Sequence, residues 1–99
     1  MEINDIGRVR AIQADVNEFQ SQGIDSISFC FVDVDLYRPV LAALNSVCGR
    51  MARGGIVAVH DCDPRAENPY EGAWSAYTGF VRAKELAEHI RERIGVLRF

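Results

Sequence analysis

Cysteines are few in this sequence and lack the spacing of a metal site or a disulfide framework. Cys30, Cys48 and Cys62 are an odd number, and no pair has CxxC spacing. We therefore expect free, buried thiols, without a disulfide or a zinc site. Thiols of that kind are typical of a reducing compartment, so the expected localisation is cytoplasmic.

Long apolar runs and an excess of positive charge are also missing. No hydrophobic segment approaches the roughly 20 residues that a transmembrane helix needs, and the acidic, polar start at Met1–Asp5 does not resemble a signal peptide. The net charge is −3, and the 11 basic residues are scattered along the chain. Neither a nucleic acid nor a membrane is therefore expected as a partner.

Glycine-rich loops are the third absence. The eight glycines never form G-x-G-x-G, the turn with which many dinucleotide-binding folds hold phosphate. The composition is otherwise globular, with 48% hydrophobic and 25% charged residues. A chain of 99 residues makes at most one small domain.

The chain does contain an alternation of short apolar strands and helical stripes. Apolar runs predict strands at Val9–Asp15, Ile27–Val32, Ile56–Val59 and Ile94–Phe99. Apolar spacing of three and four residues predicts helices at Asn17–Gln22, from Pro39 to about Arg53 with a stop at Gly54-Gly55, and at Tyr70–Arg91. We expect an α/β fold, a Rossmann-like three-layer α/β/α arrangement whose mainly parallel sheet has about four strands.

Two of the predicted strands end in acidic residues. Asp33 and Asp35 follow the second strand, and His60 and Asp61 follow the third. The carboxyl ends of parallel strands share one edge of a sheet, and neighbouring strands lie about 4.8 Å apart, so Asp33 and Asp61 could share a ligand. Gathered carboxylates repel one another unless a proton or a cation intervenes. Their oxygens suit Mg²⁺, Ca²⁺ or Mn²⁺, whereas His60 is an awkward partner for Mg²⁺ and could instead orient a carboxylate or a substrate hydroxyl.

Each of these residues also has a simpler interpretation. Asp33 or Asp35 could cap the helix that follows. His60 could be an ordinary loop histidine, and Asp61 and Asp63 could be turn residues. The combination is more informative than any single member.

The same residues resemble a known family. Phe31–Tyr37 reads FVDVDLY and is followed by a helix and by GGIVAVHD at Gly54–Asp61. This order resembles the S-adenosylmethionine-dependent methyltransferases of the macrocin O-methyltransferase type, in which D-x-D-x-Y precedes a helix, a GG-strand and a D-D or H-D pair. Gly72, Ala76 and Phe80 resemble the family's G-x-x-x-A-x-x-x-F helix. The resemblance extends over nearly the whole chain from Val9.

The resemblance implies a role for each site residue. Asp33, His60 and Asp61 would hold a metal ion, Mg²⁺ in the first instance, although His60 stands where the family often has another aspartate. Asp35 would be the catalytic base that takes a proton from the acceptor hydroxyl, with His60 as the second catalytic residue. Asp15 would approach the adenine of S-adenosylmethionine, and Asp33 would lie on the cofactor side.

The family's glycine-rich cofactor loop, and the acid that holds the ribose, lie on two earlier strands that have no counterpart here. We therefore expect residues 1–99 to form one partial domain, the C-terminal half of a methyltransferase, with little or no activity alone. The expected function is metal-assisted O-methylation of a sugar or another small-molecule hydroxyl. Besides that acceptor, a second copy of the chain is a candidate partner.

Three other functions fit parts of the pattern. A nucleotide-sugar glycosyltransferase could use Asp33-x-Asp35 to hold a metal, but His60-Asp61 would then have no role. A phosphatase of the haloacid dehalogenase type would need Thr or Val at Tyr37 and a lysine nearer than Lys84. A non-catalytic, partial Rossmann-like module would expose an apolar strand edge and assemble with a partner chain.

Overall fold

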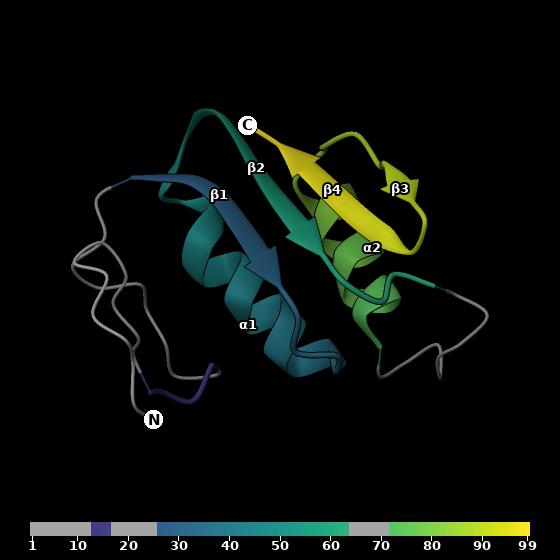
Figure 1. The fold of residues 1–99 in the computed structure, drawn as a ribbon. Coiled ribbons are helices and arrows are strands. Elements are labelled where there is room, and N and C mark those ends of the chain that lie inside the picture. The colour runs from purple at the N-terminus through teal and green to yellow at the C-terminus, as the bar shows by residue number, and fades with distance from the viewer. Residues whose placement is uncertain (1–12, 17–25, 64–71) are drawn as a thin grey trace.

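The structure is a computed structural model that describes residues 13–16, 26–63 and 72–99. The predicted helix at 17–22 and most of the predicted strand at 9–15 lie outside these residues, and Gln13–Asp15 form no strand. Within the described part, no helix has the length and apolar character needed to cross a membrane. The elements, in chain order (Figure 1), are β1 (Ile27–Val32), α1 (Tyr37–Cys48), β2 (Met51–Val59), α2 (Ala73–Ala83), β3 (Ile90–Arg91) and β4 (Ile94–Arg98).

The helix α1 forms where its apolar stripe predicted it, but with different ends. It begins at Tyr37, and Pro39 lies in the first turn, where its missing N–H has no acceptor to lose. The N-cap is Leu36, which makes no side-chain capping hydrogen bond, so neither Asp33 nor Asp35 caps this helix. The helix ends at Cys48 and is followed by Gly49, several residues before the predicted stop.

The glycines predicted to stop that helix lie inside β2. Ile27 pairs with Met51 and Phe29 with Ile56, so β2 advances five residues (56 − 51) while β1 advances two (29 − 27). This irregularity contains Gly54, at φ 83°, and Gly55. A Cβ on Gly55 would lie 2.8 Å from the Ala52 carbonyl oxygen. Glycine is needed here because the backbone folds closely on itself within a strand.

The sheet is mixed, so the prediction of a mainly parallel sheet is not confirmed. Its order is β1-β2-β4-β3. β1 and β2 are parallel, but β4 is antiparallel to both of its neighbours. The reason lies in the segment predicted as one long helix: α2 ends at Ala83, and a tight turn at Glu92-Arg93, both with positive φ, joins β3 to β4. The final strand therefore returns as half of a hairpin.

Both helices pack on one face of the sheet (Figure 1), and the described core lies between them and that face. Residues paired across the strands share a face, so Cys30, Val57 and Leu97 point the same way. On the opposite face, Phe29 is 62% and Phe31 48% exposed. The described part therefore has two layers, and the predicted third layer is not confirmed.

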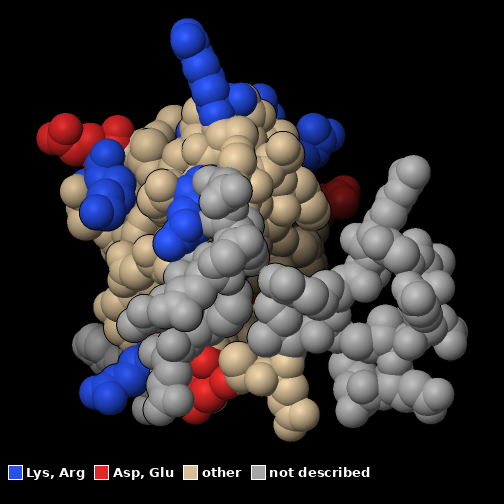
Figure 2. All heavy atoms as spheres, turned by 90° about the vertical axis from the view of Figure 1, so that its left-hand side faces the viewer, with Lys and Arg blue, Asp and Glu red and all other residues tan. Residues whose placement is uncertain are grey.

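Figure 2 shows the molecule from the side on which β1 lies in Figure 1. The described lysine and arginine side chains on this side are dispersed over the surface and are not gathered into one patch. This dispersal follows from the sequence, in which the basic residues do not form a run.

Tyr77 joins α2 to the hairpin through buried hydrogen bonds. Its side chain is completely buried. Its hydroxyl accepts from the His89 backbone N–H at 2.9 Å and lies 2.9 Å from the carbonyl oxygens of His89 and Val96, to which it can donate. Gly95 allows this approach, because a Cβ there would lie 2.7 Å from the Tyr77 ring. The hairpin is therefore fixed against α2.

We expect Tyr77→Phe to lower the free energy of unfolding by about 0.5–1.5 kcal/mol, because it removes the acceptor of the partly buried His89 N–H. Urea denaturation followed by circular dichroism would measure the loss. Trp74→Phe, a change on the same helix at a half-buried side chain, is the control and should cost less. Equal stability of Tyr77→Phe and the parent would contradict the structural role of the hydroxyl.

The three cysteines are free thiols, as predicted; Cys62 is buried, and Cys30 and Cys48 are half-buried. Burial raises the pKa of Cys48 from 9.0 to about 11, with a further increase from the neighbouring Cys30 and a small opposing effect of Lys84. Burial also raises the pKa of Cys30. Both groups are therefore almost entirely in the thiol form at neutral pH.

Cys48 should consequently react slowly with iodoacetamide, since the thiolate is the nucleophile. At pH 8, we expect alkylation of Cys48 in the folded chain to be on the order of a hundredfold slower than in urea, where the pKa returns to its ordinary value. Peptide mapping by mass spectrometry gives the rate for each cysteine. Similar rates in the folded and unfolded chains would show that Cys48 is not protected in this way.

Candidate functional site

The parallel pairing of β1 with β2 brings the two acidic strand ends together. Val32 pairs with Val59 at the last step of the ladder. The His60 N–H then donates to the Val32 carbonyl at 2.9 Å, which extends the pairing by one residue. Asp33 and His60 are thereby neighbours across the strands, as the sequence predicted for residues at this edge.

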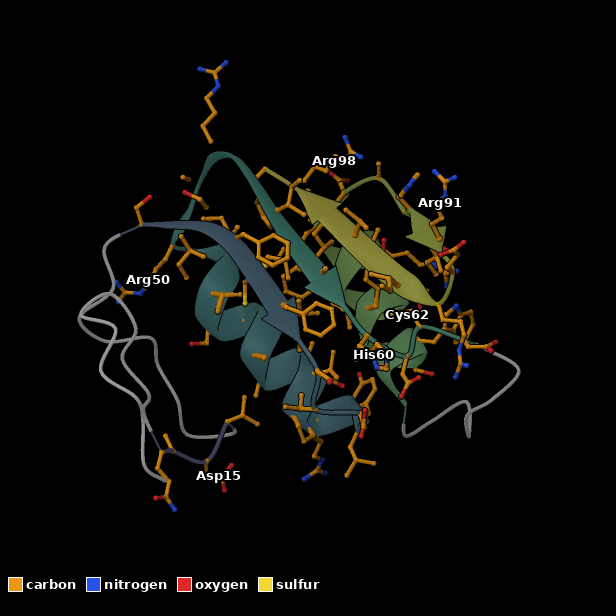
Figure 3. The ribbon with its side chains drawn as sticks, in the orientation of Figure 1. Asp15, Arg50, His60, Cys62, Arg91 and Arg98 are labelled. Atoms are coloured by element: carbon orange, nitrogen blue, oxygen red, sulfur yellow. The ribbon has the colours of Figure 1, made fainter. Side chains whose placement is uncertain are left out.

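Asp33, Asp35 and His60 form a cluster of potential ligands, called here the DDH cluster. One ligand atom from each lies within 4.8 Å of the other two. The His60 Nδ1 lies 3.3 Å from the Asp33 Oδ1 and 3.6 Å from the Asp61 Oδ2. This nitrogen is buried and makes no hydrogen bond in the described part of the chain. It therefore lies near two carboxylates, and Figure 3 shows His60 at the end of β2.

The ring of Phe31 contributes to the position of His60. The two ring centroids are 6.0 Å apart and the planes are tilted by 52°. Phe31 precedes Asp33 by two residues, so both project from the same face of the sheet. His60 is thus bordered by an aromatic ring on the sheet face and by carboxylates at the strand ends.

The backbone at Asp35 has an uncommon conformation. Its φ is 62°, and the Leu36 N–H donates to the Val34 carbonyl at 2.7 Å across it. Three-residue turns with positive φ at the centre are rare and strained. Leu36 also forms an isolated antiparallel bridge with Gly72, just before α2. The structure thus fixes Asp35 between two elements, and strain of this kind is concentrated at functional sites.

Asp61 contacts both His60 and Arg93. Its Oδ1 accepts from the Arg93 Nη2 at 3.1 Å, and the Arg93 Nε lies 3.5 Å from the Asp63 Oδ2. Asp61 is not a member of the DDH cluster, in which Asp35 is the second carboxylate beside Asp33. A ligand shared by Asp33 and Asp61 stays a prediction.

Arg93 is the residue that the sequence interpretation missed. It lies between the predicted helix at Tyr70–Arg91 and the predicted strand at Ile94–Phe99. No motif marked it, because the hairpin that carries it was not predicted. A tight turn between two short strands would have been the only indication of its position.

Asp15 is exposed and lies apart from His60 in Figure 3. Its approach to the adenine of the cofactor stays a prediction. The same holds for Asp35 as a base and for Asp33 as a residue on the cofactor side.

The donor set of the DDH cluster is compatible with a divalent cation. Two carboxylates supply oxygen ligands, and the imidazole supplies one nitrogen. Mg²⁺ prefers oxygen, whereas Mn²⁺ and other transition ions also accept imidazole. The residues thus fit Mn²⁺ better than Mg²⁺, and Asp33 and Asp35 are exposed enough for an ion to reach them.

No protein-family model and no curated protein sequence matches this chain. Several solved structures do. An apo structure of CalS11, a TDP-rhamnose 3'-O-methyltransferase of calicheamicin biosynthesis, is 23% identical with a TM-score of 0.68, over 89% of this chain and 40% of that one. The O-methyltransferase NovP is 18% identical with a TM-score of 0.69, over 85% and 34%.

A second structure of CalS11, described as a calicheamicin methyltransferase, is 24% identical with a TM-score of 0.66, over 89% of this chain and 36% of that one. The chain thus spans less than half the length of each of these structures. At such identities the likeness establishes the fold alone. Over the part that it covers, the chain has the fold of these O-methyltransferases.

Proposed function

We propose that this chain is part of an S-adenosylmethionine-dependent O-methyltransferase of the macrocin type, which methylates a hydroxyl of a sugar or another small molecule with the help of a divalent cation. The observation that carries the proposal is the DDH cluster at the carboxyl ends of β1 and β2. That edge is where open α/β sheets bind their ligands. The fold shared with CalS11 and NovP supports the same reaction class.

Asp35 is the proposed base. Methyl transfer to oxygen needs the acceptor hydroxyl to lose its proton, and a positioned carboxylate contributes about 10²–10⁴-fold to such a step. Asp35 is exposed, and its backbone is held in a tight turn, so its carboxylate can reach an acceptor without having to be ordered first. The proton moves from the acceptor oxygen to a carboxylate oxygen of Asp35.

Asp33 and His60 are the proposed cation ligands, and Asp35 adds one carboxylate oxygen to the same cluster while its other oxygen takes the proton. A cation held there would supply positive charge to an oxygen that becomes negative. Asp61 and the Phe31 ring restrict the orientation of the His60 imidazole. The imidazole can therefore also orient the acceptor. Asp61, which the family resemblance implied as a ligand, acts in this proposal by orienting His60.

The methyl donor requires more polypeptide than this chain provides. S-adenosylmethionine supplies an electrophilic methyl group when it is bound. The chain has no G-x-G-x-G loop and spans 34–40% of the methyltransferase structures it matches. We therefore propose that residues 1–99 carry the acceptor and cation side of the site and have little or no activity alone.

One observation favours a second candidate, a non-catalytic module that assembles with a partner. Phe29 and Phe31 are exposed on the face of β1 opposite the helices. Exposed aromatic side chains on a strand at the edge of the described sheet are a site for association. Phe31 also contacts His60, so assembly on this face and the proposed site would not be independent.

The cation is tested by Mn²⁺ binding, followed by electron paramagnetic resonance of the free ion. We expect one Mn²⁺ per chain, bound more tightly than Mg²⁺. Asp33→Asn and Asp35→Asn should each weaken binding by about 10–100-fold or more, since even outer-shell partners of metal ligands have effects of that size. Glu88→Gln, which removes an exposed carboxylate outside the DDH cluster, is the control and should bind Mn²⁺ like the parent. Unchanged affinity in both aspartate variants would contradict the cation site.

The reaction class is tested by nuclear magnetic resonance with two ligands. S-adenosylhomocysteine should shift the backbone amide signals of Asp15 and Asp33 at millimolar concentration, whereas UDP-glucose, added to the chain already saturated with diamagnetic Mg²⁺, should shift neither. The opposite pattern would favour the glycosyltransferase. If neither ligand binds and sedimentation shows concentration-dependent association, the non-catalytic module is favoured and the methyltransferase proposal is overturned.

A further inference from the structure

We propose that Arg93 is a positioning residue for the site: it holds Asp61 away from the DDH cluster and so determines which carboxylates bind the cation. This inference rests on the proposed function, because it concerns the composition of the same cation site. It adds a residue that lies on a different strand pair, more than 30 positions along the chain from Asp61.

The contacts of Arg93 with the loop after β2 involve both its side chain and its backbone. The guanidinium donates to Asp61 at 3.1 Å and contacts Asp63 at 3.5 Å. The Arg93 carbonyl accepts from the Cys62 N–H at 2.8 Å. The side chains of Arg93 and Asp61 are 59% and 39% exposed, so the ion pair alone would contribute little. The backbone hydrogen bond fixes the two segments and lowers the entropic cost of the ion pair.

The hairpin is rigidly placed behind this contact. Cys62 is 1% exposed, and a Cβ on Gly95 would lie 2.8 Å from its sulfur. Tyr77 anchors the same hairpin through Val96 and His89. Arg93 therefore projects from a fixed turn, and only its side chain has to be ordered to reach Asp61.

The orientation of Asp61 shows what this contact prevents. Its Oδ2 is already 3.6 Å from the His60 Nδ1, while its Oδ1 is occupied by Arg93. Without the guanidinium, the carboxylate would be free to rotate towards the cation held by the DDH cluster. The site would then have three carboxylates and an imidazole in place of two carboxylates and an imidazole. Arg93 also offsets the charge of Asp61 and Asp63 beside a site that is already acidic.

The test compares Mn²⁺ affinity in the full chain and in four variants of it. Arg93→Gln should bind Mn²⁺ about fivefold more tightly than the parent, the size expected when one exposed ion pair no longer holds Asp61. Asp61→Asn alone should bind more weakly than the parent, because Asp61 orients His60, and Asp61→Asn combined with Arg93→Gln should bind no more tightly than Asp61→Asn alone. Arg91→Gln removes an exposed arginine on the same hairpin and should change the affinity by less than about twofold, because its effect would be one of screened charge only.

A second measurement needs no metal and separates the two proposals. In the metal-free chain, an Arg93 Nη–H should give a resolved signal in the parent, because Nη2 donates to Asp61. This signal should be lost in Asp61→Asn and kept in Asp63→Asn. Arg93→Lys, which keeps the charge, should bind Mn²⁺ with an affinity between those of the parent and Arg93→Gln; it also serves if Arg93→Gln fails to fold, as judged by circular dichroism.

Equal Mn²⁺ affinity in the parent, Arg93→Gln and Arg91→Gln would overturn the role of Arg93 and leave the cation site intact. A gain that survives Asp61→Asn would also overturn it, because the gain would then come from another group. Absence of Mn²⁺ binding in the parent and in Arg93→Gln alike would overturn the cation site itself, and the Nη–H signal would still decide whether Arg93 holds Asp61.

Discussion

The parallel pairing of β1 with β2 is the constraint on which the candidate site depends. Because Val32 is opposite Val59, Asp33 and His60 leave the sheet side by side. A shift of one residue would turn Phe31 and Cys30 to the opposite faces and would separate the DDH cluster. The register is fixed by the irregularity at Gly54-Gly55, where only glycine allows the backbone to approach Ala52 so closely. Two glycines at the far end of the strand therefore help to determine the chemistry at its carboxyl end.

The part of the fold that local sequence determines was predictable. β1 was predicted with its observed ends, because six apolar residues stop at an acid, and α1 was predicted from its stripe. Gly54-Gly55 was misread as a helix stop, since a glycine pair looks the same in a bulged strand as after a helix. The hairpin at 90–98 was missed because Leu86 and Ile90 continue the helical spacing of α2, although the chain leaves the helix at Lys84.

The candidate site was predictable in part for a related reason. Asp33, Asp35 and His60 follow two strands, and their proximity follows from the strands being parallel neighbours. The side-chain direction of Asp61 depends on Arg93, which approaches from a hairpin that pairs on the other side of β2. That contact is tertiary: it exists only because Tyr77 and Gly95 place the hairpin, and no spacing in the sequence encodes it.

Alternate residues of β1 have different surroundings, so they should tolerate different substitutions. Val32 and Cys30 face the helices, and a change of volume there would be resisted by a packed interior. Phe29 and Phe31 face outward, where the folded state of the chain gains little from an aromatic ring. Two exposed phenylalanines at such positions lower solubility and add little to the packed core. Substitutions at Cys30 and Val32 are therefore limited by the volume of the core. Substitutions at Phe29 and Phe31 are limited only by what contacts the outer face.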